Sequence, residues 1–394
     1  MSRETKRIIF QVVLFVATLG TTTLAGAEWA YGKSILMEGY SWDDFLSGFN
    51  YSLPFLFILS AHEFGHYFTA VYHRVKTSLP YYIPLPPFFF ILGTLGAVIR
   101  LRERVPSTTK NFDIGVAGPL AGFVAAIGVL VYAFLTLPPP EYVFQFHPDY
   151  QQYGLDYAAH VYGENMKGPG VDIVLGNNIM FTMLSWIAPQ GSVPNMHEVI
   201  HYPALFAGYL SLVFTSLNLL PIGQLDGGHV VYGLFGSRLH RWIASVTFVG
   251  FVFFAGLGVV TPVSEPSDFL PEFLVDSLPR IGQLLVVIAG FVLFLFYTFK
   301  ALGLSRANTW MTAIAVFAVQ YLATWMIPSL SGYSGWLLFA FLVGRFGGVL
   351  HPPALIEEPL TPGRKLIGWL ALLIFVLCMT PWPIEMLLVT ETAP

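Results

Sequence analysis

Cysteine is almost absent from this chain: Cys378 is the only one in 394 residues. A single cysteine excludes an intrachain disulfide and a zinc site built from cysteines. Charged residues are also scarce, at 11% of the sequence, and the net charge of −4 comes with no basic patch. Nucleic-acid binding needs such a patch, so we expect no nucleic-acid partner.

Apolar residues are in excess. They make up 55% of the sequence, aromatic residues make up 16%, and the mean hydropathy is +0.66. These values exceed what the core of a soluble domain needs. We therefore predict an all-α polytopic membrane protein that lies in a lipid bilayer.

The apolar stretches set the number of membrane crossings. A transmembrane helix needs about 20 mostly apolar residues. The sequence therefore predicts a helical bundle of about eight transmembrane helices. The eight stretches are 8–27, 51–72, 113–137, 201–221, 241–261, 281–301, 309–328 and 366–389, with 333–350 as a weaker ninth.

Two apolar stretches do not fit simple spans. Residues 83–99 contain three prolines and two glycines and lie between basic flanks, which predicts a re-entrant hairpin or loop. Residues 173–188 are too short for a span and indicate an interfacial or re-entrant helix.

Basic residues set the orientation, because cytoplasmic loops are enriched in lysine and arginine. Arg3, Lys6 and Arg7 precede the first span, so we place the N-terminus in the cytoplasm and expect this helix to be retained. The acidic segment 138–200 then lies outside. Since the N-terminus lacks a Ser- and Arg-rich transit region, we predict a bacterial cytoplasmic membrane.

The stretch His-Glu-Phe-Gly-His at 62–66 lies inside an apolar segment. Histidines four residues apart share one helix face, so His62 and His66 can bind one Zn²⁺ while Glu63 reaches a water molecule on the metal. Ionisable side chains inside a membrane are costly and are usually functional. We therefore predict one zinc ion per chain.

A catalytic zinc site usually has three protein ligands and an open position for water. Asp226 follows a long apolar run and precedes Gly227 and Gly228, which lack side chains and allow the backbone to approach closely. We therefore choose Asp226 as the third ligand. His229 is the competing residue in the same stretch.

The two motifs together, HEFGH and the later NLLPIGQLDG at 218–227, resemble the site-2 protease family of intramembrane zinc metalloproteases. The resemblance covers residues 51–261 and is greatest for the branch without a PDZ domain. It implies that the zinc ligands are His62, His66 and Asp226, and that Glu63 is the catalytic carboxylate. It also places Asn218 near the scissile carbonyl.

The resemblance further implies a substrate, which is a single-span membrane protein or a remnant signal peptide. The sequence GTLGA is similar to the re-entrant glycine segment of that family. We expect it to bind an unwound substrate by strand addition, although a plain structural plug is the alternative. The residues of this segment are Gly93, Thr94, Leu95, Gly96 and Ala97.

We expect one membrane domain over residues 1–394. Residues 51–261 form its catalytic core, and residues 262–394 add helices of unknown role. The rival function is a membrane metal-ion transporter or sensor, because His and Asp between helices also describe an ion path.

Overall fold

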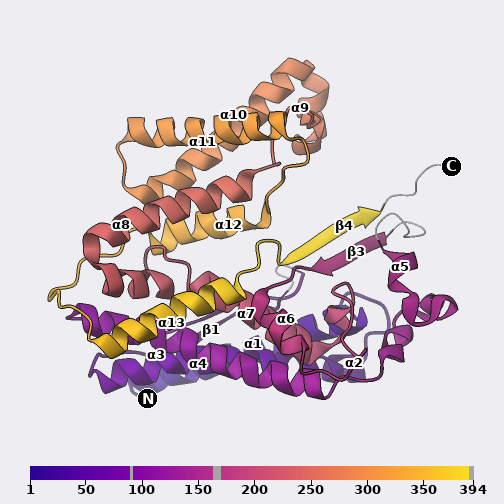
Figure 1. Ribbon diagram of the computed structural model, residues 1–394, viewed down its shortest axis with the longest axis horizontal. Coiled ribbons are helices and arrows are strands. Elements are labelled where there is room, and N and C mark those ends of the chain that lie inside the picture. The colour runs from indigo at the N-terminus through magenta and orange to yellow at the C-terminus, as the bar shows by residue number, and fades with distance from the viewer. Residues whose placement is uncertain (89–91, 163–169, 390–394) are drawn as a thin grey trace. The chain divides into compact units, whose positions relative to one another are not determined.

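The computed structural model describes residues 1–88, 92–162 and 170–389 (Figure 1). It is mostly helical, as predicted. The described residues form two compact units. Unit 1 comprises residues 1–219 and 360–394, and unit 2 comprises residues 220–359. This division does not test the expected single membrane domain, which stays a prediction.

Unit 1 contains eight of the described α-helices. Serine side chains cap two of the long ones, because Ser2 accepts from the Thr5 amide and Ser107 accepts from the Lys110 amide. The helices are α1 (Arg3–Tyr31), α2 (Trp42–Ser47), α3 (Phe49–Tyr72), α4 (Thr108–Leu135), α5 (Ala158–Val161), α6 (Ile179–Ser185), α7 (Pro203–Asn218) and α13 (Pro362–Cys378). The described part of unit 1 also contains three 3₁₀ helices, namely η1 (Pro140–Gln145), η2 (Pro148–Asp156) and η4 (Val199–His201).

Helices α3, α4 and α7 form the core of unit 1. Gly65 of α3 faces the backbone of α4 so closely that a Cβ there would lie 2.6 Å from the Ala117 carbonyl oxygen. Small residues allow helices in membranes to approach in this way. Helix α7 packs on both partners and is buried along nearly its whole length.

The segment predicted to be a re-entrant hairpin or loop forms a β-hairpin in its described part. Strand β1 (Tyr81–Pro84) pairs antiparallel with β2 (Thr94–Val98), with Tyr81 opposite Val98 and Pro84 opposite Thr94. Residues 89–91 of that prediction lie outside the described residues. The depth of the hairpin in a membrane stays a prediction.

Two predicted helices are wrong in part. The helix expected at 173–188 begins as strand β3 (Gly170–Leu175), and only α6 is helical. The span expected at 366–389 ends with α13 and continues as strand β4 (Ile384–Val389). Pro381 and Pro383 follow α13 and cannot continue it. Strands β3 and β4 pair antiparallel.

Unit 2 contains the remaining described α-helices and three short helical turns. The helices are α8 (Asp226–Gly256), α9 (Glu272–Ser277), α10 (Arg280–Phe299), α11 (Arg306–Met326) and α12 (Gly335–Leu342). The turns are η5 (Pro266–Phe269), η6 (Lys300–Leu302) and the π-helical η7 (Val343–Gly347). Helix α8 begins well before the predicted residue 241 and bends at Gly236, whose φ of 75° is not helical.

Five helices of the described chain are long and apolar enough to cross a membrane. They are Arg3–Tyr31, Thr108–Leu135, Asp226–Gly256, Arg280–Leu302 and Arg306–Met326. The predicted count of about eight is therefore not confirmed. Three predicted spans are not among the five. Helices α7 and α13 have only 16 and 17 residues, and α3 carries His62, Glu63 and His66 within its apolar run.

Candidate metal centre

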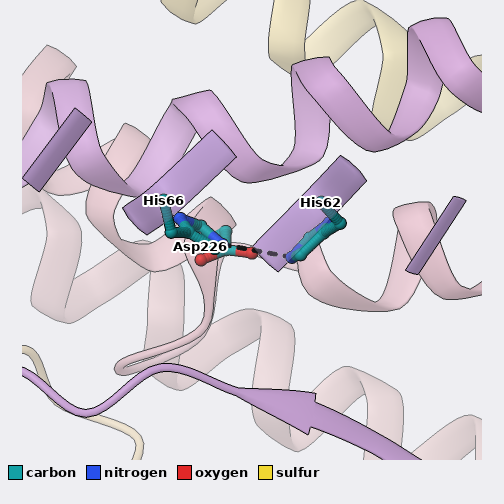
Figure 2. Close-up of side chains that lie close together, drawn as sticks. All are labelled: His62, His66 and Asp226. Atoms are coloured by element: carbon teal, nitrogen blue, oxygen red, sulfur yellow. Dashed lines mark hydrogen bonds between the residues drawn. The ribbon is translucent and has the colours of Figure 1, made fainter. Parts of the chain in front are cut away.

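Helix α3 places the imidazoles of His62 and His66 on one face (Figure 2). Their Nε2 atoms lie 3.1 Å apart, and both side chains are buried. Two nitrogen ligands of one tetrahedral zinc ion would lie about 3.3 Å apart. The helix alone therefore brings two ligand atoms to a spacing that suits one metal ion.

The tautomer of His66 follows from its neighbour. Its Nδ1 atom lies 2.7 Å from the carbonyl oxygen of Ile114 on α4. A carbonyl oxygen only accepts, so Nδ1 carries the hydrogen and donates it. In the neutral ring Nε2 then carries the lone pair and is the atom that a metal ion would bind. Such a second hydrogen bond is typical of histidines that bind metals.

Two glycines of α4 make room for these rings. A Cβ at Gly118 would lie 2.1 Å from Nε2 of His66, and a Cβ at Gly122 would lie 3.0 Å from Cβ of His62. Any larger residue at position 118 would occupy the place of the imidazole. The glycines are therefore part of the centre, although they bind nothing themselves.

Glu63 and Asn218 lie on two helices of the same core. The carboxylate of Glu63 is buried beside His62 on α3, with only 5% of the residue exposed. Asn218 is the last residue of α7, which packs against α3. The structure thus places both residues in unit 1, and their catalytic roles stay predictions.

The β-hairpin is attached to the helices that surround the centre. The Tyr82 hydroxyl and the Ser60 hydroxyl of α3 lie 2.7 Å apart, within hydrogen-bonding distance. Gly93 has a φ of 78°, and a Cβ there would lie 2.5 Å from the Thr21 carbonyl oxygen of α1. Leu95 of β2 is 54% exposed. The five residues predicted to bind substrate therefore lie on a fixed hairpin with an accessible strand.

Asp226 is the first residue of α8 and belongs to unit 2. A carboxylate is favoured there by the positive end of the helix dipole. The group His62, His66 and Asp226 (Figure 2) could hold a metal ion. The competing His229 is not a member of this group, and its Nδ1 atom lies 2.8 Å from Nε2 of His351.

A second group that could hold a metal ion was missed by sequence reasoning. It consists of His147, Glu198 and His201, all in unit 1. Burial lowers the pKa of His201. Burial alone would raise the pKa of Glu198, but the neighbouring His147 imidazole and the Tyr162 hydroxyl lower it. Glu198 and His201 are three positions apart, but His147 lies about 50 positions earlier. The three residues therefore form no local motif, and the only signal in the sequence is the acidic, histidine-containing character of this segment.

Comparison with known proteins extends these findings. Residues 50–261, more than half of the chain, match the family described as Peptidase family M50. The chain is 34% identical over 196 residues to the probable zinc metalloprotease EGY1, chloroplastic, of Arabidopsis thaliana, covering 48% of this chain and 29% of that protein. The protein of the same name from Oryza sativa subsp. japonica is 30% identical over 206 residues, with 52% and 31% covered.

A further relative is the probable zinc metalloprotease EGY3, chloroplastic, of Oryza sativa subsp. indica. It is 28% identical over 250 residues, which cover 60% of this chain and 37% of that protein. The chain therefore spans about a third of the length of the curated relatives that it matches. No solved structure shows a significant match. The family match includes both HEFGH of α3 and Asp226 of α8, and the chain belongs to peptidase family M50, the site-2 protease family.

Proposed function

We propose that this protein is an intramembrane zinc metalloprotease. It hydrolyses a peptide bond within or near the transmembrane segment of a single-span membrane protein. The observation that carries this proposal is the pair of buried imidazoles on α3 with Glu63 beside them, in a chain of peptidase family M50. The names of the matched relatives support zinc as the metal.

His62, His66 and Asp226 would hold the metal ion. When bound, zinc acts as a Lewis acid and makes water nucleophilic near neutral pH. Two neutral imidazoles and one carboxylate are a common ligand set for a catalytic zinc ion. The hydrogen bond from His66 Nδ1 to Ile114 keeps one ligand nitrogen unprotonated.

Glu63 is the general base. Its carboxylate takes a proton from the attacking water and then delivers that proton to the nitrogen of the leaving amine. Burial of the carboxylate removes competing bulk water from this transfer. Asn218, at the end of α7, donates a hydrogen bond from its amide to the developing oxyanion or to the substrate backbone.

The substrate must be unwound before it can be cut, because a helix shields its own peptide bonds. Strand β2 offers an edge for this purpose, since it pairs with β1 on one side in the described part of the chain. Residues Gly93, Thr94, Leu95, Gly96 and Ala97 hold the unwound segment by strand addition. The substrate class is a membrane protein or a remnant signal peptide.

The helices and the family indicate a membrane protein. We propose that its N-terminus is cytoplasmic and that it lies in a bacterial cytoplasmic membrane, although the matched relatives are named chloroplastic. Arg74 lies eight positions after His66, and the six steps from His66 to Tyr72, the last residue of α3, rise about 9 Å. Cleavage is therefore expected near the cytoplasmic end of the substrate's transmembrane helix. Residues 51–261 form the catalytic core, and residues 262–394 are an addition to it.

The Glu63→Gln variant separates this function from a metal-ion transporter or sensor. We would reconstitute the purified wild type and the variant in liposomes and measure zinc content, zinc flux and cleavage of a single-span substrate. A protease keeps its zinc and loses cleavage in the variant. A transporter continues to move zinc, and that outcome would contradict the proposal. Glu103→Gln, a change at a partly exposed carboxylate, is the control.

A further inference from the structure

The second cluster lies outside the proposed catalytic centre. His147 follows η1 and precedes η2, Glu198 precedes η4, and His201 ends η4. The Nε2 atoms of the two histidines lie 3.3 Å apart. The Oε2 atom of Glu198 lies 3.4 Å from Nε2 of His147 and 3.7 Å from Nε2 of His201. Three potential ligand atoms thus converge on one point.

These spacings fit a tetrahedral metal ion. Zinc binds nitrogen and oxygen at about 2.0 to 2.2 Å, so two ligands at the tetrahedral angle lie about 3.3 to 3.6 Å apart. The measured triangle has sides close to this range. Two imidazole nitrogens and one carboxylate oxygen suit zinc, whereas calcium and magnesium prefer a shell of oxygen atoms.

His201 is oriented as a ligand. Its Nδ1 atom lies 2.9 Å from the carbonyl oxygen of Ala30 in α1. The carbonyl can only accept, so Nδ1 carries the hydrogen and Nε2 of the neutral ring presents a lone pair to the cluster. The same arrangement holds His66 in the proposed catalytic centre. In both places a backbone carbonyl sets the tautomer that a metal requires.

Glu198 is the strongest sign that the cluster binds a ligand. The residue is only 2% exposed, and its Oε2 atom has no hydrogen-bond partner within the described residues. The other carboxylate oxygen accepts from the Tyr162 hydroxyl. A buried carboxylate oxygen without a hydrogen bond is costly. A cation at the centre of the triangle would satisfy it.

We propose that His147, Glu198 and His201 bind a divalent transition-metal cation, for which zinc is the best match. The three ligands come from two separate segments, and Ala30 ties His201 to α1. The metal would therefore fasten the segment around His147 to α1 and to the start of α7. The side chain of His147 is 33% exposed, so solvent reaches this side of the cluster and water could supply a fourth ligand.

The alternative occupant of the triangle is a proton. His147 would then donate from Nε2 to Glu198 or to His201 without any metal. Counting zinc ions separates the two cases, because a shared proton adds no metal to the purified protein. The double variant His62→Ala/His66→Ala lacks the imidazole ligands of the proposed catalytic centre. Any zinc ion that it still holds is therefore bound elsewhere.

We would purify the full-length chain in detergent with zinc present, remove loose metal by dialysis, and measure zinc per chain by mass spectrometry. The expected contents are two zinc ions for the wild type, one for His62→Ala/His66→Ala and one for His147→Asn. The control is His160→Asn, a nearby histidine whose side chain is 48% exposed, and it should keep two.

The proposal is wrong if the wild type holds one zinc ion and the His62→Ala/His66→Ala chain holds none. It is also wrong if His147→Asn and His160→Asn both hold as much zinc as the wild type. Should His147→Asn fail to fold, the double variant still decides the question, since adding zinc to it after chelation should raise its Tm. An unchanged Tm would mean that the cluster holds a proton.

Discussion

The Nδ1 atom of His66 lies 2.7 Å from the carbonyl oxygen of Ile114, so helix α4 orients a metal ligand that helix α3 carries. The centre thus depends on the packing of two helices as well as on a motif in one of them. Glycines at the contact let that packing occur.

Gly118→Ala should disable the metal centre. The added methyl group would lie 2.1 Å from Nε2 of His66, so the ring must leave its position. We expect zinc affinity to fall by about 10- to 100-fold or more, as when a supporting contact of a metal ligand is lost. Zinc titration of the purified protein measures this.

Gly128→Ala is the matched control on the same helix, because a Cβ there has nothing within 4 Å. Equal zinc affinities for the two variants would show that α4 does not support His66 as described.

Gly93→Ala should weaken cleavage without removing zinc. Its φ of 78° disfavours any side chain, and a Cβ would lie 2.5 Å from the Thr21 carbonyl oxygen. The hairpin must therefore shift, and we expect KM for a single-span substrate to rise several-fold. Gly96 has a similar φ of 100°, but a Cβ there would have open space around it. Gly96→Ala should therefore raise KM less than Gly93→Ala does. A larger defect in Gly96→Ala would argue against the attachment of the hairpin to α1.

Asp113→Asn should destabilise unit 1. Arg364 of α13 donates two hydrogen bonds, of 2.7 and 2.8 Å, to the Asp113 carboxylate on α4, and His73 lies 2.9 Å from the same group. Losing the charge weakens these contacts and should lower the free energy of unfolding by about 1 to 3 kcal/mol. The shift in Tm in detergent is the measurement.

The control for the Asp113–Arg364 ion pair is Glu103→Gln. This change removes an exposed ion pair between Glu103 and Lys76, whose atoms lie 3.8 Å apart. Its effect should be about 0 to 1 kcal/mol. Similar losses in both variants would mean that the Asp113 pair adds no more than an ordinary surface pair.

His351 should make unit 2 sensitive to acid. Burial lowers the pKa of this histidine from 6.5, and His229, His240 and Tyr232 surround its ring. As the pH falls below about 6.5, the unfolded chain gains a proton that the folded chain resists. The free energy of unfolding therefore drops as the pH falls from that value toward the lowered pKa.

His351→Asn should reduce this dependence. The test is the difference in Tm between pH 8 and pH 5.5, values chosen about one unit or more on either side of the histidine pKa. A slope equal to that of the wild type would show that the acid sensitivity lies elsewhere.

The sequence by itself determined the features that depend on local spacing. The period of a helix places His62 and His66 on one face, and α3 over Phe49–Tyr72 lies close to the predicted 51–72. Apolar length likewise predicted α4, α10 and α11 to within a few residues. These features need only the residues within one segment.

Tertiary structure decided whatever needs two distant segments. Residues 384–389 form a strand because they pair with β3, which lies more than 200 positions earlier in the chain. No local sequence pattern predicts that pairing. Gly118 lies against His66, and His147 meets Glu198, only because separate elements pack together. The sequence determines which side chains are present and their chemistry. The distances between separate segments arise from packing, so the second cluster forms only in the folded structure.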